Sequence, residues 1–194
     1  MNKQEIIKFF DRYAPQWDAD MVRDEEIINA ILDNAGVKAG DSILDVGCGT
    51  GVLVPDYLAR GVSSVTCVDI SPAMIACARE KHPQPNLRLI CADVEICQFE
   101  TPFDRIIVYN AFPHFPHPAR VIEKLAGDLN SGGLLTVAHG MSRASIDRHH
   151  EGTASSVSIG LMHEDELEKL MGLYLTVTVK ISSDKMYQVV GFKD

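Results

Sequence analysis

Short apolar segments alternate with helix-like segments through the middle of this chain, and this alternation limits the folds that are open to it. The apolar segments are residues 42–46, 65–68, 87–91, 105–108 and 134–139. Helix-like stretches follow near residues 52–60, after Ser71 and at 119–129. Strands that alternate with helices pair in parallel through right-handed crossovers. We therefore predict an α/β fold with a Rossmann-like, doubly wound sheet and helices on both faces.

The C-terminal part departs from this alternation. After a predicted helix at residues 164–171, residues 174–181 and 186–192 resemble two strands joined by a short turn. Their connection is too short for a crossover helix, so the two strands should be antiparallel. We expect a seven-stranded, mostly parallel sheet with one antiparallel strand near the C-terminal edge.

The chain has 194 residues and contains no repeat, low-complexity tract or linker, which favours a single domain over residues 1–194. Residues 1–35 contain two amphipathic helices, at 2–12 and 22–35, separated by a proline. Residues 36–139 form the alternating core, and residues 140–162 form the longest insertion in the pattern. Residues 163–194 hold the last helix and the strand pair.

The net charge of −9 argues against a nucleic acid or an anionic membrane surface as partner. Binding to phosphates requires clustered lysine and arginine, and the basic residues here are scattered. We expect a small-molecule partner. The oligomeric state stays open, with a homodimer among the states that the sequence allows.

The sequence favours a cytoplasmic protein. No apolar run approaches the roughly 18 residues that span a bilayer, and the first residues have no signal-peptide pattern. The five cysteines are odd in number and form no Cys-x-x-Cys pair, so neither a disulfide framework nor a zinc knuckle is indicated. We expect free, buried thiols.

Glycines follow the first predicted strand at alternate positions, Gly47, Gly49 and Gly51. In doubly wound sheets, ligands bind outside the carboxyl ends of the strands, where such a loop lies. Asp69 ends the second strand, 22 residues after Gly47, at about the separation at which an acid reaches ribose hydroxyls. A ribose-bearing ligand is therefore predicted.

The details of the loop favour one such ligand. The nicotinamide fingerprint is Gly-x-Gly-x-x-Gly, whereas Val52 stands where its third glycine would be. Asp45 precedes the loop, where it would repel a diphosphate but could accept a hydrogen bond from an ammonium group. Ribose, adenine and an amino-acid tail together satisfy these features. S-adenosyl-L-methionine, with S-adenosyl-L-homocysteine as its product, is the predicted cofactor.

Four sequence blocks also resemble those of the class I S-adenosylmethionine-dependent methyltransferases. The blocks are "ILDVGCGTG", "VDISPAMI", "CADVE" and "FDRIIVYNAF", in this order within residues 40–140. The preceding "FFDRYAPQWD" is similar to the N-terminal segment of the small-molecule branch, which includes the ubiquinone/menaquinone-biosynthesis-type enzymes. The resemblance implies methyl transfer to a small-molecule acceptor.

The resemblance also implies roles for individual residues. Gly47, Cys48, Gly49 and Gly51 would face the methionine part of the cofactor, and Asn110 and Ala111 would follow the fourth strand beside it. Asp69 would hold the ribose hydroxyls. The adenine would contact a second group, comprising Ile70, Met74, Asp93 and Val94. Tyr13 and Trp17 would fold over the cofactor as a lid.

Histidines are the candidates for acid–base chemistry. His114 follows the fourth strand and His139 ends the fifth, so both should lie at the ligand-binding edge. A histidine suits proton removal at neutral pH. Pocket shaping and metal binding are the alternatives, although no compact ligand spacing is visible and we assign no metal. His82 and His117 adjoin prolines and are expected in solvent.

The acceptor should be covered by the insertion at residues 140–162, because long loops in compact domains are often lids or binding loops. It contains a predicted helix at 142–150 that ends in His149 and His150. We assign these two histidines, with Phe112 and Phe115, to the acceptor site.

Two other functions stay open from the sequence. A protein that binds the cofactor without transferring its methyl group would keep the same glycine loop and carboxylates. An oxidoreductase that uses NAD is disfavoured by Val52 and by the antiparallel C-terminal strands.

Overall fold

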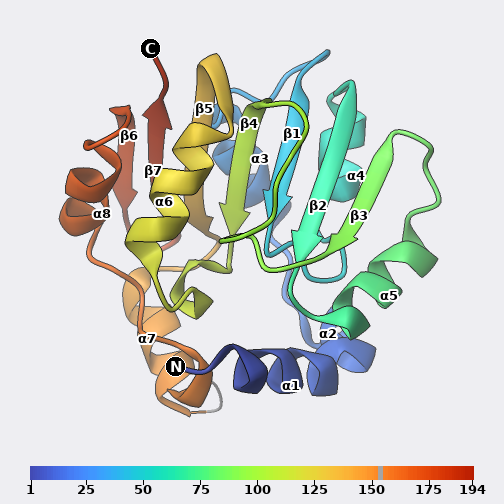
Figure 1. The fold of residues 1–194 in the computed structure, drawn as a ribbon. Coiled ribbons are helices and arrows are strands. Elements are labelled where there is room, and N and C mark those ends of the chain that lie inside the picture. The colour runs from blue at the N-terminus through green and yellow to red at the C-terminus, as the bar shows by residue number, and fades with distance from the viewer. Residues whose placement is uncertain (153–154) are drawn as a thin grey trace.

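A computed structural model describes residues 1–152 and 155–194 and contains one seven-stranded sheet (Figure 1). The strands are β1 (Ser42–Val46), β2 (Ser64–Asp69), β3 (Leu87–Cys91), β4 (Phe103–Tyr109), β5 (Leu129–His139), β6 (Thr176–Ser182) and β7 (Tyr187–Phe192). Their order across the sheet is β3-β2-β1-β4-β5-β7-β6. The order therefore changes direction between β1 and β4, where doubly wound sheets bind their ligands.

The strand directions confirm the predicted sheet. β1 is parallel to β2 and β4, β2 is parallel to β3, and β4 is parallel to β5. β7 is antiparallel to both of its neighbours, β5 and β6. The single reversed strand thus lies next to the C-terminal edge strand.

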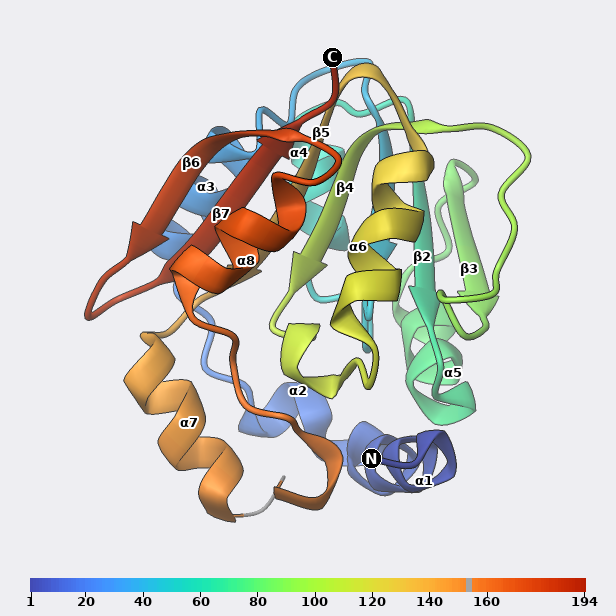
Figure 2. The ribbon, with the colours of Figure 1, turned by 60° about the vertical axis from the view of Figure 1, so that its left-hand side comes forward.

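Helices cover both faces of the sheet (Figure 2). Apolar side chains of α3, α4 and α5 pack on one face, and those of α6 and α8 pack on the other. Within the described part of the chain, no helix has the length and apolar character needed to cross a bilayer. The α-helices are α1 (Lys3–Tyr13), α2 (Trp17–Asp20), α3 (Glu25–Asn34), α4 (Val54–Ala59), α5 (Pro72–Lys81), α6 (Pro118–Gly127), α7 (Arg143–Gly152) and α8 (Glu164–Met171).

Burial of the strands follows their place in the sheet. Four of the five residues of β1 are buried, as are five of the seven of β4, because helices cover both faces of these central strands. The edge strand β6 instead alternates between exposed and partly buried residues. The apolar runs in the sequence therefore mark the strands that frame the ligand-binding edge.

Polar caps fix where two helices begin. The Ser71 side chain accepts a hydrogen bond from the Met74 N–H, and Pro72 follows it at the first position of α5. The Asp24 side chain accepts from the N–H groups of Glu26 and Ile27 at the start of α3. Because Ser71 stands two residues after Asp69, its cap also fixes the chain at the end of β2.

The segment between the first two predicted helices is more helical than expected. Residues 14–16 form the 3₁₀ helix η1 (Ala14–Gln16), and α2 continues from it. Pro15 lies in the first turn of η1, where its missing N–H removes no helical hydrogen bond. The proline therefore redirects the helical chain across the sheet edge without ending it.

The segment at residues 130–133, expected to lead into the fifth strand, belongs to β5 itself. Leu129 pairs with Phe103 and Leu134 with Arg105, so the register shifts between these pairs. The Gly132 N–H donates to the Lys193 carbonyl at 2.7 Å, and the Lys193 N–H donates to the Gly133 carbonyl at 3.0 Å. These bonds to the C-terminal strand hold the irregular segment in the sheet.

All five cysteines are free thiols, but their burial differs. Cys48 and Cys67 are buried, whereas Cys91 is exposed. The expectation of a buried thiol is wrong for Cys91 because it stands on the edge strand β3, where one side lacks a neighbouring strand.

Candidate active site

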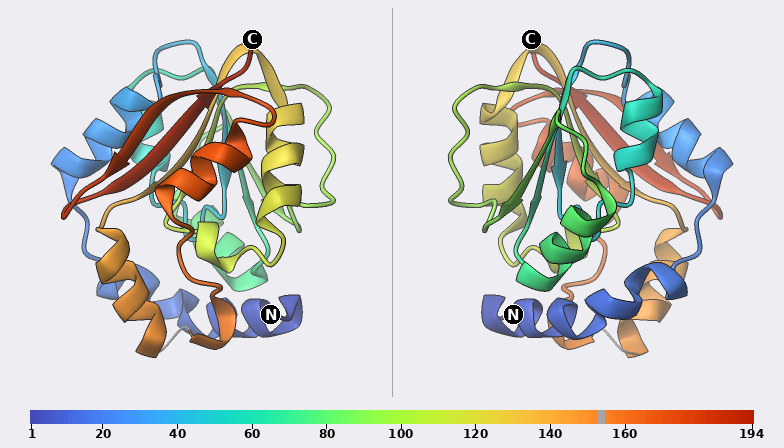
Figure 3. Two further views of the ribbon diagram at one scale, coloured as in Figure 1. Left: turned by 90° about the vertical axis from the view of Figure 1, so that its left-hand side faces the viewer. Right: turned by 90° about the vertical axis from the view of Figure 1, so that its right-hand side faces the viewer.

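A pocket lies at the carboxyl ends of the parallel strands, and α1 runs along this edge of the sheet (Figure 1). Turned views place α1, α2 and α7 at the same end of the molecule (Figure 3). The predicted cofactor residues that line the pocket are Trp17, Asp45, Gly47, Cys48, Gly49, Asp69, Ile70, Met74, Asp93, Val94, Asn110 and Ala111. His114 and Phe115 also line it.

Asp69 joins the glycine loop to the start of α5. Its Oδ2 accepts the N–H of Gly49 at 2.9 Å, and its Oδ1 accepts the N–H of Ser71 at 2.8 Å. Burial raises the pKa of the Asp69 carboxyl, although these backbone hydrogen bonds act in the opposite direction. The carboxylate therefore holds the loop while it also lines the pocket.

Asp45 is a buried carboxyl group at the end of β1. It is 2% exposed, and the structure gives it no side-chain hydrogen bond or ion pair among the described residues. Burial, with a contribution from the charge of Asp69, raises the pKa of Asp45 to about 7. A positively charged group in the pocket would favour the ionised form.

The glycine loop has no room for a side chain at Gly47, whereas a Cβ at Gly49 would meet its neighbours at ordinary contact distances. Gly47 has φ of +68°, and a Cβ on it would lie 2.6 Å from the Cβ of Ala111. A Cβ on Gly49 would lie 3.7 Å from the indole nitrogen of Trp17 and 3.9 Å from the sulfur of Met74. The loop thus leaves backbone, with little side-chain bulk, along this side of the pocket.

Asn110 has a left-handed backbone directly after β4. Its φ of 53° makes it the one non-glycine residue with positive φ in the described ranges. Its N–H donates to the Ala138 carbonyl at 2.9 Å, and its Oδ1 accepts the Gly140 N–H at 3.0 Å. Such strained positions cost about 1–3 kcal/mol and occur often at functional sites.

Asp93 is paired with a residue of α1. Lys3 forms salt bridges with Asp93 and, at 3.0 Å, with Glu95. The other carboxylate oxygen of Asp93 accepts the N–H of Glu95 at 3.0 Å. Lys3 and Glu95 themselves line the pocket, so α1 closes the side that the Asp93 carboxylate faces.

Two more acids fasten the N-terminal helices over the pocket. Asp11 accepts hydrogen bonds from the Ser71 hydroxyl at 2.6 Å and from the Ala73 N–H at 3.2 Å. Asp18 accepts from the Thr50 hydroxyl at 2.6 Å and pairs with Lys81 at 2.7 Å. These contacts tie α1 and α2 to the helix after β2 and to the glycine loop.

The two aromatic residues predicted as a lid have different places. Trp17 lines the pocket, with its ring 5.7 Å from that of Phe10. Tyr13 is not among the lining residues, and its ring packs against Phe9 with centroids 4.7 Å apart. Tyr13 packs along its own helix against Phe9, so the pocket contacts of α1 come from Lys3, Ile6 and Phe10.

His114 lies on the 3₁₀ helix η2 (Phe112–His114), which directly follows the end of β4. Its Nδ1 lies 2.7 Å from the carbonyl oxygen of Val157, and its ring meets that of Phe10 edge to face, 4.9 Å between centroids. Val157 ends η3 (Ser155–Val157) in the predicted insertion. The insertion therefore contacts the one predicted catalytic residue that lines the pocket.

His139 and Phe112 lie behind the pocket and are not among its lining residues. His139 is 2% exposed, lies opposite Tyr187 in the β5–β7 pairing, and has its ring 6.2 Å from the tyrosine ring. Phe112 is 1% exposed and packs 6.4 Å from Phe115, centroid to centroid. Both side chains point into the core. Side chains alternate between the two faces of β5, which directs His139 toward Tyr187, and the turn of η2 directs Phe112 inward.

Gly51 faces away from this pocket and packs against His82. A Cβ on Gly51 would lie 2.7 Å from a ring carbon of His82. His82 is 9% exposed, so the expectation that it lies in solvent is wrong. It ends α5 and folds back on the glycine loop, whereas His117 is exposed as expected.

His149 and His150 belong to α7, which lies at the same end of the molecule as the pocket (Figure 3). Their side chains lie outside the described part of the structure. Their assignment to the acceptor site stays a prediction.

Comparisons with known proteins agree with this geometry. A family model described as a methyltransferase domain matches residues 43–133. The malonyl-[acyl-carrier protein] O-methyltransferase of Acetivibrio thermocellus is 32% identical over 138 residues, which cover 70% of this chain and 49% of that protein. The ubiquinone biosynthesis O-methyltransferase of Coxiella burnetii is 32% identical over 143 residues, covering 70% of this chain and 61% of that protein.

Residues 43–133 of this chain match a methyltransferase domain.

Solved structures of methyltransferases have the same fold as this chain. N-methyltransferase NodS from Bradyrhizobium japonicum WM9, in complex with S-adenosyl-L-homocysteine, aligns with a TM-score of 0.75 and 15% identity over 95% of this chain and 96% of that chain. Magnesium protoporphyrin IX methyltransferase (ChlM) from Synechocystis PCC 6803, with the same compound bound, gives 0.75 and 16% over 99% of each chain.

Part of the pocket was not predicted from the sequence. The missed lining residues are Lys3, Ile6, Phe10, Met21, Val52, Leu53, Val68, Ala92, Glu95, Tyr109 and Pro116. The missed residues of α1 lie on one face of an amphipathic helix. The periodicity of such a helix indicates that a face is buried but not what it packs against. Met21 lies four positions after Trp17, and the others flank predicted residues by one or two positions, so a wider margin around each block would have included those.

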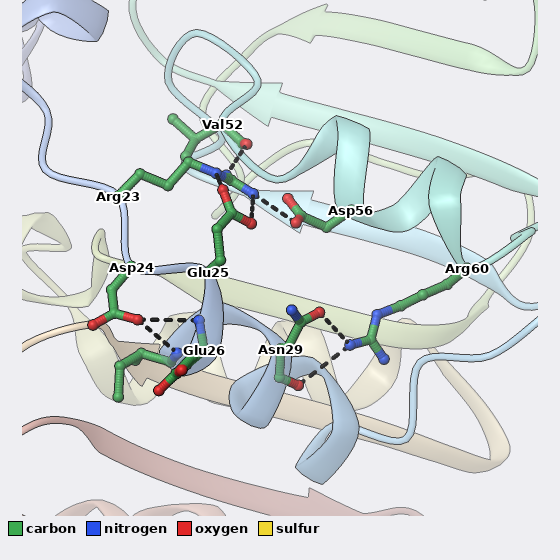
Figure 4. A network of polar contacts seen from close by, with 9 residues as sticks. Arg23, Asp24, Glu25, Glu26, Asn29, Val52, Asp56 and Arg60 are labelled. Atoms are coloured by element: carbon green, nitrogen blue, oxygen red, sulfur yellow. Dashed lines mark hydrogen bonds and ion pairs between the residues drawn. The ribbon is translucent and has the colours of Figure 1, made fainter.

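Arg23 anchors the chain where its N-terminal helices meet its core (Figure 4). Its Nη1 donates to the Val52 carbonyl at 2.9 Å, its Nη2 donates to Asp56 at 2.6 Å, and its Nε donates to Glu25 at 2.6 Å. A planar guanidinium suits such a forked arrangement. The segment between α2 and α3 is thereby held to the residues that follow the glycine loop.

Proposed function

We propose that this protein transfers the methyl group of S-adenosyl-L-methionine to a small-molecule acceptor. The observation that carries the proposal is the pairing of Asp69 with the backbone of Gly49 in a pocket that also contains Asp45 and Asp93. Few ligands other than an adenosyl amino acid would use a bare glycine loop and these carboxylates together.

The pocket residues would divide the cofactor among them. Asp69 would accept hydrogen bonds from the ribose hydroxyls, Asp93 from the adenine amino group, and Asp45 from the ammonium group. The adenine would pack among Ile70, Met74 and Val94, which surround the apolar part of the pocket. When bound, this cofactor supplies a methyl group on a positively charged sulfur, which leaves as a neutral thioether.

The acceptor would enter from the side of Phe115 and the insertion. Two relatives are named O-methyltransferases, one for a malonyl-[acyl-carrier protein] and one for ubiquinone biosynthesis. Since the chain spans 49% and 61% of their lengths, their acceptors give only the class of reaction. We keep His139, His149, His150 and Phe112 as predicted contributors to the acceptor side, where His139 and Phe112 would act from behind the lining residues.

Binding and transfer are tested separately. Calorimetry with S-adenosyl-L-homocysteine should give micromolar affinity, and NAD should give no heat of binding. Incubation with methyl-labelled cofactor and a metabolite extract should then transfer label to a small molecule. Binding without transfer would favour a cofactor-binding protein, and binding of NAD alone would favour the oxidoreductase.

We infer a cytoplasmic location from the five free thiols, which are typical of a reducing compartment. A homodimer is part of the same set of proposals, and light scattering across a concentration series would test it. We also propose a division of the chain into four parts. These are an N-terminal lid (1–35), a cofactor-binding core (36–139), an acceptor-side insertion (140–162) and a terminal helix with a strand pair (163–194).

A further inference from the structure

The carboxyl group of Asp45 lines the pocket without a partner. It is 2% exposed, and neither a hydrogen bond nor an ion pair joins its side chain to another described residue. Buried carboxylates are normally paired or hydrogen-bonded, because removing a charge from water is costly. A buried, unpaired carboxyl group on the wall of a pocket therefore points to a positive charge in the ligand.

The side chains around Asp45 supply no such charge. The titratable groups that act on it or respond to it are Cys67 and Asp69 of β2, Cys48 of the glycine loop and Tyr57 of α4. Thiols and phenols are ordinarily neutral at pH 7, and burial raises the pKa of Tyr57 further. The charged neighbour of Asp45 among these groups is thus Asp69, which has the same sign.

The other acids of the pocket are compensated where Asp45 is not. The carboxylate of Asp69 accepts two backbone N–H groups, at 2.9 and 2.8 Å. The ammonium group of Lys3 forms salt bridges with both Asp93 and Glu95. Asp45 is therefore the pocket carboxyl group whose charge the protein leaves to be balanced by a ligand.

The lining residues as a set also carry excess negative charge. Their acidic and basic members among the described residues are Asp45, Asp69, Asp93 and Glu95 with Lys3, which gives a formal charge of −3 when all five are ionised. His114 lines the pocket as well, and even in its protonated form it would leave the set negative. The potential inside the pocket thus favours a ligand with net positive charge.

The two forms of the proposed cofactor differ in this respect. S-adenosyl-L-methionine has an ammonium group, a carboxylate and a positively charged sulfur, so its net charge is positive. In S-adenosyl-L-homocysteine the sulfur is neutral, and the ammonium and carboxylate groups cancel. Contacts with adenine, ribose and the ammonium group are common to both, so the charge on sulfur is what the pocket would distinguish.

We propose that this site selects its ligand by charge, with Asp45 as the specificity-determining residue, and binds the sulfonium form in preference to the neutral thioether product. This inference rests on the proposed methyl transfer. Two unit charges up to about 12 Å apart, in an effective dielectric constant of about 20, change an affinity by about tenfold or more. Loss of the charge on transfer would therefore weaken binding and promote product release.

Calorimetry near pH 7 without an acceptor tests the selection. Wild type should bind S-adenosyl-L-methionine at least about tenfold more tightly than S-adenosyl-L-homocysteine. An analogue with a methyl-bearing carbon in place of the sulfonium keeps the shape but lacks the charge, and it should bind like S-adenosyl-L-homocysteine. In Asp45→Asn the preference should fall by about tenfold. Asp184→Asn, which removes a charge at an exposed position, is the matched control and should keep it.

Proton release provides a second measurement, on wild type itself. Burial, with a contribution from the charge of Asp69, raises the pKa of Asp45 to about 7, so about half of the ligand-free molecules hold this proton at pH 7. A cation favours the ionised form. Binding of S-adenosyl-L-methionine should therefore release up to about half a proton. Calorimetry in buffers with different ionisation enthalpies measures the release, and Asp45→Asn subtracts the contributions of other groups and of the ligand.

The outcomes separate this inference from the proposed function. It would be overturned by equal or tighter binding of S-adenosyl-L-homocysteine to wild type, by an unchanged preference in Asp45→Asn, or by tight binding of the uncharged methyl analogue. Equal proton release in wild type and Asp45→Asn would also overturn it. If Asp45→Asn binds no ligand, the wild-type preference and the uncharged analogue still decide. If wild type binds none of these ligands, the proposed function itself fails.

Discussion

The carboxylate of Asp69 accepts the backbone N–H of Gly49 at 2.9 Å, so the acid that ends β2 holds the loop that follows β1. The two residues are twenty positions apart, and the parallel pairing of β1 with β2 brings them together. Its other oxygen accepts the Ser71 N–H, so both oxygens have a structural role while the side chain still lines the pocket. Any change of this carboxylate should affect ligand binding and loop order together.

Asp69→Ala should weaken binding of S-adenosyl-L-homocysteine by about 10- to 150-fold, because hydrogen bonds to a charged group contribute about 1.5–3 kcal/mol. Calorimetry measures the change. Asp184→Ala, at an exposed position in the turn between β6 and β7, is the control and should bind as wild type does. Unchanged affinity in Asp69→Ala would remove the ribose assignment.

Asp45→Asn should stabilise the ligand-free protein in a pH-dependent way. The pKa of Asp45 rises from 3.8 to about 7 on folding, so the folded state holds this proton more tightly than the unfolded state. Wild type therefore loses stability as the pH rises from about 4 to about 7, by about 4 kcal/mol. The variant lacks this loss.

Urea unfolding at pH 5 and pH 8 measures this effect, with Asp184→Asn as the control. The gain in Asp45→Asn should be larger at pH 8, and its affinity for S-adenosyl-L-homocysteine should be lower than that of wild type. A gain of equal size at both pH values would contradict the shifted pKa.

Asp11→Ala should loosen α1 without affecting α3. The substitution removes the bonds to the Ser71 hydroxyl and the Ala73 N–H, which tie α1 to α5. A loss of one or two kcal/mol in local stability corresponds to about 5- to 30-fold faster opening. Hydrogen exchange monitored by mass spectrometry would report it in residues 3–13. Residues 25–34 serve as the internal control, and unchanged exchange in α1 would show that the helix is held by its apolar face alone.

Gly140→Ala should destabilise the protein through one atom of Tyr109. A Cβ on Gly140 would lie 2.5 Å from the tyrosine hydroxyl oxygen, and overpacking of this kind costs about 1–3 kcal/mol. In a Tyr109→Phe background the obstacle is gone, so the same substitution should cost less. Denaturant unfolding of the four proteins gives the coupling energy.

Gly127→Ala provides the contrast for this cycle. A Cβ there meets no atom within 4 Å, and the residue lies in α6. This substitution should be neutral or slightly stabilising. Additive effects of Gly140→Ala and Tyr109→Phe would mean that the main chain moves instead of the tyrosine.

Much of the fold was predictable because burial is continuous along the central strands. β1 and β4 are covered on both faces, so their apolar runs appear directly in the sequence. The place of residues 130–133 within β5 was not predictable, because the segment is held by hydrogen bonds to Lys193, at the far end of the chain. Local turn residues suggested a loop there, and tertiary pairing overrode them.

The site was predictable where a residue acts through its position after a strand. Asp69, Asp93 and Asn110 line the pocket because parallel strands bring their carboxyl ends to one edge. Side-chain direction was harder to predict. Tyr13 and His139 were both predicted to contact ligands. The Tyr13 ring instead packs along its own helix, and the His139 ring packs against Tyr187. The role of Lys3 depends on the docking of α1, for which the local sequence holds no signal.

The chain after α7 reaches His114 and Pro113 through main-chain atoms of Val157 and Ile159. Main-chain contacts persist through most exchanges of side chains but shift when residues are inserted or lost. Homologous proteins could therefore vary the side chains of this segment, provided that the spacing from α7 to Val157 is kept. Loop length, more than loop chemistry, would then be the inherited constraint on how the imidazole is oriented.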